Sequence, residues 1–183
     1  MEPRVFGSLG YASVPSHAFK AALGGELRFG EGASGWVGAL SLAYARGDHA
    51  NAYGRLALTL LTLELQLCPQ GVALNGSVWL RACGQLRGGG INLSISPGEL
   101  PVVPEDAKWR PWAAFGAGLA AGFPLTERLE LRGLFELAVQ LVRDRFEVAR
   151  LGSEGSAEGG ATDTLYRPEA LSLELGLGLG FAF

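Results

Sequence analysis

Two cysteines flank the strongest hairpin signal in the chain. Cys68 and Cys83 lie on either side of Asn75-Gly76, a dipeptide that favours a type I′ turn because both central residues of that turn need a positive φ. The two strands of such a hairpin bring the thiols together. We therefore predict a Cys68–Cys83 disulfide, as found in proteins of an oxidising compartment such as the bacterial periplasm. Two reduced, buried thiols are the alternative.

The register of this hairpin follows from its turn. If Leu74 pairs with Ser77, stepping outward places Cys68 opposite Cys83. The same count makes the cysteines a hydrogen-bonded pair, in which the Cα atoms are about 5.5 Å apart. A disulfide then needs a bulge or a twist in the ladder, and we expect Pro69 to mark it.

Residues that could support hydrolysis are sparse. Asp48 beside His49 has the composition of an oriented general base, and His17 follows Ser16. An outer-membrane lipid A deacylase of the PagL type carries its His and Ser close together on one strand, whereas both histidines here fall in predicted turns or loops. We therefore expect no enzymatic activity. A PagL-like deacylase or an acyltransferase is the alternative.

Cofactor and nucleic-acid sites are not expected either. Gly116 to Ala121 matches the dinucleotide fingerprint, but Phe123-Pro124 follows where that motif needs a helix. The Cys and His residues lack the spacing of a zinc site, so no metal and no cofactor is predicted. The net charge is −3 and no long run carries one sign, which excludes the electrostatic pattern of a nucleic-acid-binding protein. Arg46-Gly47-Asp48 spells a cell-adhesion tripeptide in a predicted outer loop, and we attribute it to chance.

The C-terminal segment has the pattern of a transmembrane strand. From Leu171 to Phe183 every second residue is Leu or Phe, and the residues between are Ser, Glu, Gly or Ala. One face of a strand with this period is bulky and apolar, and the other is small or polar. Because bilayer hydrocarbon offers no hydrogen-bond partners, such a strand persists in a membrane only within a closed barrel.

Seven further segments continue this pattern, which gives an even number of strands, as bacterial barrels usually have. The expected strands are residues 4–13, 18–30, 36–46, 53–68, 77–88, 110–123, 127–143 and 171–183. We therefore predict an all-β protein, an eight-stranded antiparallel up-and-down transmembrane β-barrel. It forms one domain over residues 1–183.

Charged residues indicate which face of these strands points inward. Arg or Lys on the lipid face near the bilayer centre costs about 2 to 4 kcal/mol, whereas a charge in the lumen can find a partner. In the predicted strands, charges occur on the bulky apolar face only at upper strand ends. The predicted lumen network consists of Glu26, Arg28, Glu64, Arg81, Arg87, Glu130, Arg132, Glu136 and Glu174.

These charges nearly balance, and the interior of an eight-stranded barrel is only wide enough for side chains. We therefore expect an ion-paired plug, with a narrow channel as the alternative. A soluble, lipocalin-like barrel would place its apolar groups inside. It is disfavoured because the other face is rich in Gly and carries too few polar groups to solvate an exterior.

The connections alternate in length, which sets the orientation. Short turns face the periplasm and long loops face outward, so residues 88–109 and 144–167 are expected as outer loops. Two aromatic girdles follow. The upper girdle is Tyr11, Phe19, Tyr44, Tyr53, Trp109, Trp112 and Tyr166, and the lower is Phe29, Trp36, Phe123, Phe181 and Phe183.

Other routes into a membrane are not expected. Residues 111–126 carry no charge, but prolines bracket them and the segment is too short for a helical span. An outer-membrane protein must also be exported, and no signal peptide precedes Glu2. We expect Met1 to be an initiator placed before a mature sequence.

With its terminal Phe183, its alternating last strand and its short turns and long loops, the chain resembles small outer-membrane barrels of the OmpA/OmpX type. Its Gly-, Ala- and Arg-rich composition and its Cys68/Cys83 hairpin are also similar to barrels of myxobacteria and related deltaproteobacteria. The resemblance implies a bacterial outer-membrane location and assembly by the barrel-insertion machinery, with Phe181 and Phe183 as the assembly signal.

The same resemblance implies a non-enzymatic protein that displays its outer loops for surface interaction or for envelope assembly. We expect a monomer in outer-membrane lipid. Its extracellular or envelope partner is not identified by the residues, and nucleic acid is not expected.

Overall fold

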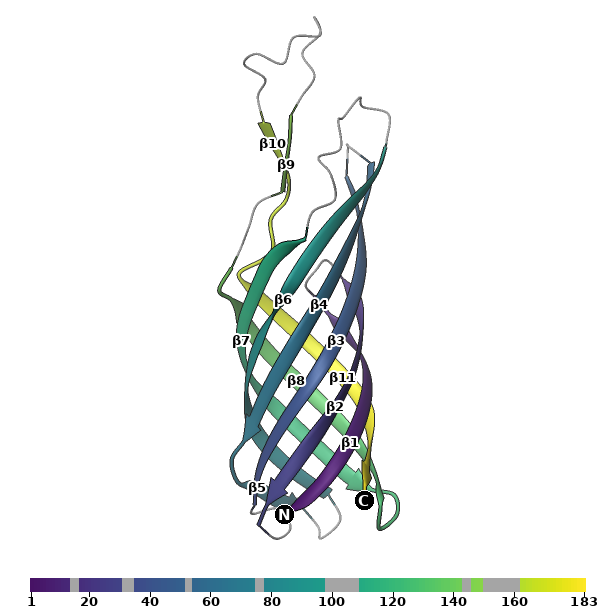
Figure 1. Ribbon diagram of the computed structural model, residues 1–183, viewed down its shortest axis with the longest axis vertical. Helices are drawn as coiled ribbons and strands as arrows, with labels where there is room; N and C mark the ends of the chain where they lie inside the picture. Colours follow the sequence, from purple (N-terminus) through teal and green to yellow (C-terminus); the bar gives the residue numbers. More distant parts are fainter. Residues whose placement is uncertain are drawn as a thin grey trace, which may run out of the picture.

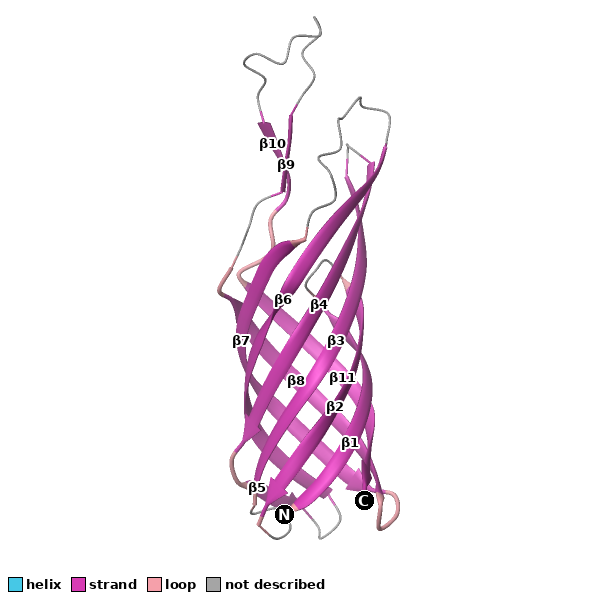
Figure 2. Cartoon of the chain, viewed as in Figure 1, coloured by secondary structure: helices cyan, strands magenta, loops and turns pink. Residues whose placement is uncertain are grey.

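The structure, a computed structural model, consists of strands, turns and loops (Figure 2). It describes residues 1–13, 17–30, 35–51, 54–74, 78–97, 109–142, 146–149 and 162–183. The strands are β1 (Glu2–Ala12), β2 (Ala18–Phe29), β3 (Trp36–Asn51), β4 (Gly54–Cys68), β5 (Gly71–Leu74), β6 (Val78–Pro97), β7 (Arg110–Pro124), β8 (Leu129–Gln140), β9 (Phe146–Ala149), β10 (Thr162–Tyr166) and β11 (Leu171–Ala182). Across these ranges, no helix is long and apolar enough to span a bilayer.

The strands close into an antiparallel barrel. The sheet runs in the order β4-β3-β2-β1-β11-β8-β7-β6, and β4 also pairs with β6, which completes the cylinder. β5 continues β4 after a break at Pro69 and Gln70 and pairs with β6, so β4 and β5 form one wall strand. The predicted eight-stranded up-and-down barrel is confirmed. Both termini lie at one end, here called the lower end (Figure 1).

Three strands of the barrel wall, β3, β4 and β6, continue above the other wall strands at the upper end (Figure 1). β2 pairs with β3 only up to Arg46, and β7 pairs with β6 only up to Ile91. Above these points β3, β4 and β6 continue together as a three-stranded ladder. We call residues 45–51, 54–60 and 91–97 the extension.

The extension corrects two predictions about outer loops. β6 continues to Pro97, although the sequence predicts a loop from Gly88, and Arg46-Gly47-Asp48 lies within β3. The physical reason is that the polar and apolar faces of these strands exchange places at the upper end. The pattern of apolar side chains on the outer face therefore ends, although the hydrogen-bonded ladder continues. Residues 98–108 and 150–161 of the predicted loops, and the Asn75-Gly76 turn, lie outside the described residues. β9 and β10 pair with each other within the second predicted loop.

Below the extension, the outer surface of the barrel is a continuous apolar belt. Its outward-pointing side chains are mostly Leu, Val, Phe and Tyr, with Leu23 70% exposed and Leu177 68% exposed. Soluble monomers rarely expose contiguous apolar patches larger than a few hundred Å². The belt is therefore the surface with which the barrel contacts lipid, and the lipocalin-like alternative does not apply.

Aromatic side chains lie at both edges of the belt. The exposed lower set is Phe29, Trp36, Phe123, Phe181 and Phe183, and the exposed upper set is Tyr11, Phe19, Tyr44 and Trp109. Trp112 is only 4% exposed and lies in the lumen, where its Nε1 donates to Gln140 Oε1 at 3.4 Å. Its assignment to the upper girdle is wrong because Trp112 shares the inward phase of β7 with Ala114. Tyr53 and the side chain of Tyr166 lie outside the described residues.

Candidate functional site: the barrel lumen

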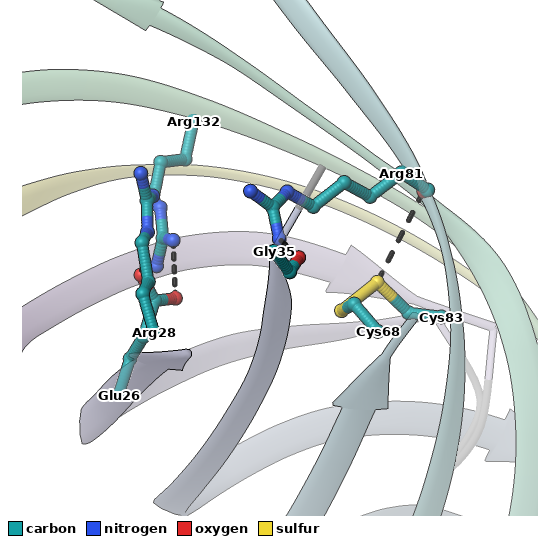
Figure 3. Close-up of a disulfide and its surroundings, with 7 residues drawn as sticks. All are labelled: Glu26, Arg28, Gly35, Cys68, Arg81, Cys83 and Arg132. Carbon is teal, nitrogen blue, oxygen red and sulfur yellow. Dashed lines mark hydrogen bonds and ion pairs between the residues drawn. A yellow bond between two sulfur atoms is a disulfide. The ribbon is translucent and has the colours of Figure 1, made fainter. Parts of the chain in front are cut away.

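The lower part of the lumen holds an ion-paired group, the lower cluster, which consists of Arg4, Glu26, Arg28, Glu130 and Arg132. Arg28 donates from Nε to Glu26 Oε1 at 2.7 Å and from Nη2 to Glu130 Oε1 at 2.9 Å. Arg132 donates from Nε to Glu130 Oε1 at 2.9 Å and from Nη2 to Glu26 (Figure 3). Arg4 Nη1 donates to Glu130 Oε2 at 3.2 Å. These contacts join β1, β2 and β8 across the interior.

Trp79 lies within the lower cluster. Its Nε1 donates to Glu130 Oε2 at 3.0 Å. The guanidinium carbons of Arg28, Arg81 and Arg132 lie 5.4, 5.2 and 5.8 Å from the centre of the indole ring, within the range of cation–π attraction. A Cβ on Gly122 would lie 2.2 Å from this ring, so only glycine lets the indole pack against β7.

The middle of the lumen holds a second group, the central cluster, formed by Lys20, Glu64, Arg87, Glu136 and Glu174. Arg87 Nη2 lies 2.7 Å from Glu136 Oε2 and 2.9 Å from Glu174 Oε2, and Arg87 Nη1 also contacts Glu174. Lys20 Nζ donates to Glu174 Oε2 at 2.9 Å and bonds Glu64 as well. Each member comes from a different strand, so the cluster ties β2, β4, β6, β8 and β11 together.

Sequence reasoning missed two members of these clusters, Arg4 and Lys20, and the neighbouring Trp79. Two of them carried a signal, because Lys20 shares the inward phase of β2 with Glu26, and Trp79 shares the inward phase of β6 with Arg81. In the first strand the sequence places an aromatic side chain, Phe6, in the inward phase. Phe6 points inward, where the Arg132 guanidinium carbon lies 5.4 Å from its ring centre.

Small cavities remain between these side chains. One of about 50 Å³ is bounded by Lys20, Glu64 and Glu174, and one of about 70 Å³ is bounded by Trp79 and Arg132. Phe6 lines both.

The upper lumen is apolar. We call the buried cluster there the apolar cap; it consists of Ala18, Ala45, Leu56, Leu58, Leu60, Ile91, Leu93, Trp112, Ala114, Ala138 and Phe146. Leu56 and Leu58 are 0% exposed. The Arg110 guanidinium carbon lies 4.7 Å from the Phe146 ring centre, at the start of β9. The side chains that fill the barrel therefore change from charged to apolar toward the outer end.

Cys68 and Cys83 form a disulfide that faces the lumen near the lower end (Figure 3). Arg81 lies beside it and donates from Nη1 to the Gly35 carbonyl at 2.7 Å. Both cysteines are buried, Cys68 at 3% exposure and Cys83 at 6%. They pack with Val37 and Ala120 in the barrel wall.

The ladder around the disulfide differs in register from the prediction. Leu74 pairs with Val78 rather than with the expected Ser77. Between Leu67, which pairs with Gly84, and Gly71, which pairs with Arg81, the β4–β5 side holds one extra residue. The irregularity therefore occurs at Pro69, as expected. The Cα atoms of the cysteines are 4.1 Å apart, closer than the spacing of about 5.5 Å expected for a hydrogen-bonded pair.

The structure describes only some of the residues considered for catalysis. His17 is exposed with a φ of 54°, and its Nδ1 contacts the Tyr11 hydroxyl. His49 lies within β3 and not in the predicted loop. Its side chain and all of Ser16 lie outside the described residues. Among the described residues, no group of three or more His, Cys, Asp or Glu side chains is placed to hold a metal ion.

The glycine-rich segment from Gly116 to Ala121 lies within β7, whose next element is β8. A dinucleotide fingerprint needs a helix at that position. The segment is therefore wall strand, and its small inward residues leave room for neighbouring side chains. A Cβ on Gly116, for example, would lie 2.2 Å from Glu136 Oε1.

Solved structures match the chain over its full length, although no protein-family model and no curated protein matches it. A major outer membrane protein from Thermus thermophilus aligns with a TM-score of 0.68 and 15% identity, covering 100% of this chain and 98% of that chain. The chain has the fold of small outer-membrane β-barrels.

Two further barrels align with this one. Neisserial surface protein A aligns with a TM-score of 0.58 and 10% identity, over 100% of this chain and 96% of that one. Ail of Yersinia pestis, crystallised with the heparin analogue sucrose octasulfate, aligns with a TM-score of 0.50 and 13% identity, over 100% and 97%. The expected resemblance to small outer-membrane barrels is thus confirmed for the fold.

The proposed assembly signal lies at the lower edge of the belt. Phe181 and Phe183 are exposed, and their rings meet edge to face with centroids 5.5 Å apart. Both point away from the lumen, in the same phase as Leu177 and Leu179. The aromatic end of β11 is therefore available on the outer surface.

Proposed function

We propose that this chain is a sealed, non-enzymatic, single-domain β-barrel of the bacterial outer membrane that presents its upper end to a partner. The observation that carries the proposal is the occupied lumen: the lower cluster, the central cluster and the apolar cap follow one another along the barrel axis. Its role is then to hold the extension and the β9–β10 hairpin above the membrane, for surface interaction or as a subunit of an envelope assembly.

The lumen argues against a channel. The two cavities between the charged side chains have volumes of only about 50 and 70 Å³, and an ion entering from outside would also have to cross the apolar cap. Conduction through such a barrel would require the side chains of the plug to move apart. We therefore favour a display role over a narrow channel.

Planar-bilayer recording tests the seal. The purified barrel should give no steady unitary conductance, because the charged clusters and the cap fill the lumen. A double variant, Arg28→Ala with Trp79→Ala, removes two side chains from the lower lumen. Its conductance is compared with that of the unaltered protein. Steady conductance from the unaltered protein would favour the channel and remove the sealed-barrel proposal.

Site-specific photo-crosslinking in cells tests the display role. A photoreactive residue at Asp48, which points outward on the extension, should crosslink to a protein or polysaccharide. The same residue at Leu40, which points outward on the belt, should crosslink to lipid. Lipid adducts alone at both positions would contradict the display role.

A lipid-modifying enzyme remains the alternative function. Incubation with lipopolysaccharide tests it directly, and we expect no fatty acid to be released. Release that disappears in His17→Ala would favour the enzyme.

Assembly and oligomeric state belong to the same proposal. The barrel-insertion machinery would recognise β11 with Phe181 and Phe183, and the folded product would be a monomer in outer-membrane lipid. Removal of Phe183 should lower the yield of inserted barrel, measured by the mobility shift of unheated samples in gels.

A further inference from the structure

The sulfur atoms of the disulfide are enclosed by the closed barrel. Cys68 and Cys83 point inward and are almost fully buried, with Val37 packed beside them. Arg81 lies next to them and is bonded to Gly35 on the segment that leads into β3. Neither of the two lumen cavities described above has a cysteine in its wall.

Enclosure matters because disulfides form by direct attack at sulfur. A thiolate must approach the oxidant's disulfide closely and form a mixed disulfide. An oxidant approaching through the lumen from the outer end would have to pass the apolar cap and the central cluster. One approaching from the lower end finds Cys68 and Cys83 only 3% and 6% exposed, with Arg81 beside them. An approach from outside the barrel is blocked by the hydrogen-bonded ladder of β4 and β6.

We propose that the Cys68–Cys83 bond forms before the barrel closes, in an open β4–β5–β6 hairpin, by exchange with a dithiol oxidase of the periplasm. The oxidase is assigned to the periplasm on the basis of the proposed function; the order of the two events rests on the geometry alone. The β4–β5–β6 segment is then a transient substrate of a thiol–disulfide oxidoreductase.

The step balances as an ordinary exchange. One cysteine thiolate attacks the oxidase disulfide, which forms a mixed disulfide and releases one oxidase thiolate. The second cysteine thiolate attacks the mixed disulfide, the Cys68–Cys83 bond forms, and the oxidase leaves as a dithiol. The chain loses two protons and two electrons, and the oxidase takes up both electrons.

The topology allows this order. The cysteines are 15 residues apart in one hairpin, whereas closure needs β1 to pair with β11 at the opposite end of the chain. Local contacts cost less loop entropy than distant ones and form earlier. The early bond would also fix the bulge at Pro69, and with it the register of the long β4–β6 ladder above.

Oxidised glutathione is the probe that tests the order. The full-length chain is refolded with reduced thiols into detergent micelles, and a second sample is kept unfolded in urea. Free thiols are then counted over time by maleimide labelling after denaturation. The folded barrel should be oxidised at least about 100-fold more slowly than the unfolded chain, because attack must wait for the barrel to open.

A matched control shows that the reagent reaches thiols in the micelle. Ser94→Cys in a Cys68→Ser/Cys83→Ser background places one thiol on the outer face of the extension, where Ser94 is exposed. This thiol should react at similar rates in folded and unfolded samples. Oxidation of the folded, reduced barrel as fast as the control would overturn the proposal.

If the reduced chain does not fold, the reverse reaction gives the same answer. The folded, oxidised barrel is treated with dithiothreitol before and after unfolding in urea. The disulfide should resist reduction until the barrel unfolds, and rapid reduction in the folded state would overturn the proposal. Neither result depends on conductance or on cellular location, so a failure here is distinct from a failure of the proposed function.

Discussion

The belt-level barrel and the extension are built from the same strands, but their inward and outward faces carry opposite kinds of side chain. At the belt the inward face is polar and the outward face apolar, and in the extension this arrangement is reversed. At the belt, the row Ser41–Glu64–Arg87 points inward and the row Leu42–Leu63 points outward. In the extension, the row Gly47–Leu58–Leu93 points inward and the row Arg46–Thr59–Asn92 points outward. The backbone ladder is continuous between them, so only the choice of side chains differs.

This reversal shows where the solvent changes. Lipid accepts an apolar exterior and leaves the lumen as the place for charges, whereas water requires a polar exterior and drives apolar groups inside. The change occurs over one row, above Tyr44, Leu61 and Gly90. Trp109 covers that row, because a Cβ on Gly90 would lie 2.9 Å from its ring. We place the upper surface of the membrane at this row.

The largest effect should come from removing a charge in the belt-level lumen. Arg87→Ala leaves Glu64, Glu136 and Glu174 buried without the guanidinium that lies among them. Breaking a buried pair in this way costs about 3 to 5 kcal/mol. The free energy of unfolding in urea, measured in detergent or in liposomes, checks it.

An arginine of the extension is the matched control. Arg46 is exposed on the outer face, so Arg46→Ala should change the free energy of unfolding by less than about 0.5 kcal/mol. Equal losses for the two variants would mean that the lumen ion pairs do not stabilise the barrel.

The second effect should come from the apolar cap. Leu58→Ala removes a fully buried side chain from the extension, and truncations of this kind cost about 2 to 5 kcal/mol. The loss should be local, with faster hydrogen exchange in the upper parts of β3, β4 and β6. Leu63→Ala, which faces lipid on the same strand, is the control, and faster exchange there than in Leu58→Ala would contradict the reversed pattern.

The third effect should come from placing a positive charge on the outer face of β4, once below and once above the upper surface of the membrane. Leu65→Arg puts a cation on the lipid face of the belt, which costs about 2 to 4 kcal/mol near the bilayer centre. Thr59→Arg puts the same side chain on the same face of β4, but in the extension, and should cost almost nothing. Unfolding in liposomes measures both, and a similar loss for the two variants would move the membrane surface upward.

The same comparison explains what the sequence could and could not predict. Strand number and inward phase were predictable, because alternation at the belt is strict and lipid leaves few alternatives. The cysteine pairing was predicted from the Asn75-Gly76 turn. It is correct although Leu74 pairs with Val78, because the extra residue near Pro69 restores the expected register above it. The upper ends of β3 and β6 were not, because Ile91 and Leu93 are apolar in the phase that holds Arg87 below. A prediction that requires apolar side chains on the same face along the whole strand therefore ends the strand where the two faces exchange.

In the lumen, too, the sequence predicts some features and not others. The inward phase predicted which charges point into the lumen, but the alternation of residues says nothing about pairing across the barrel. Lys20 bonds Glu64 and Glu174, which are distant in sequence, and this depends on barrel diameter and on the stagger of the strands. The phase of Trp79 indicates that it points inward, but the space for its ring depends on Gly122, which becomes its neighbour only in the folded register.

The smallest effect should come from that glycine. Gly122→Ala places a methyl group 2.2 Å from the Trp79 ring, and overpacking of this kind costs about 1 to 3 kcal/mol. Because the indole bonds Glu130, its displacement should also shift the tryptophan fluorescence of the folded barrel. Gly84→Ala is the control, since a Cβ there meets no atom within 4 Å. A stability loss in Gly84→Ala as large as in Gly122→Ala would show that the cost arises from the strand backbone and not from the packing of Trp79.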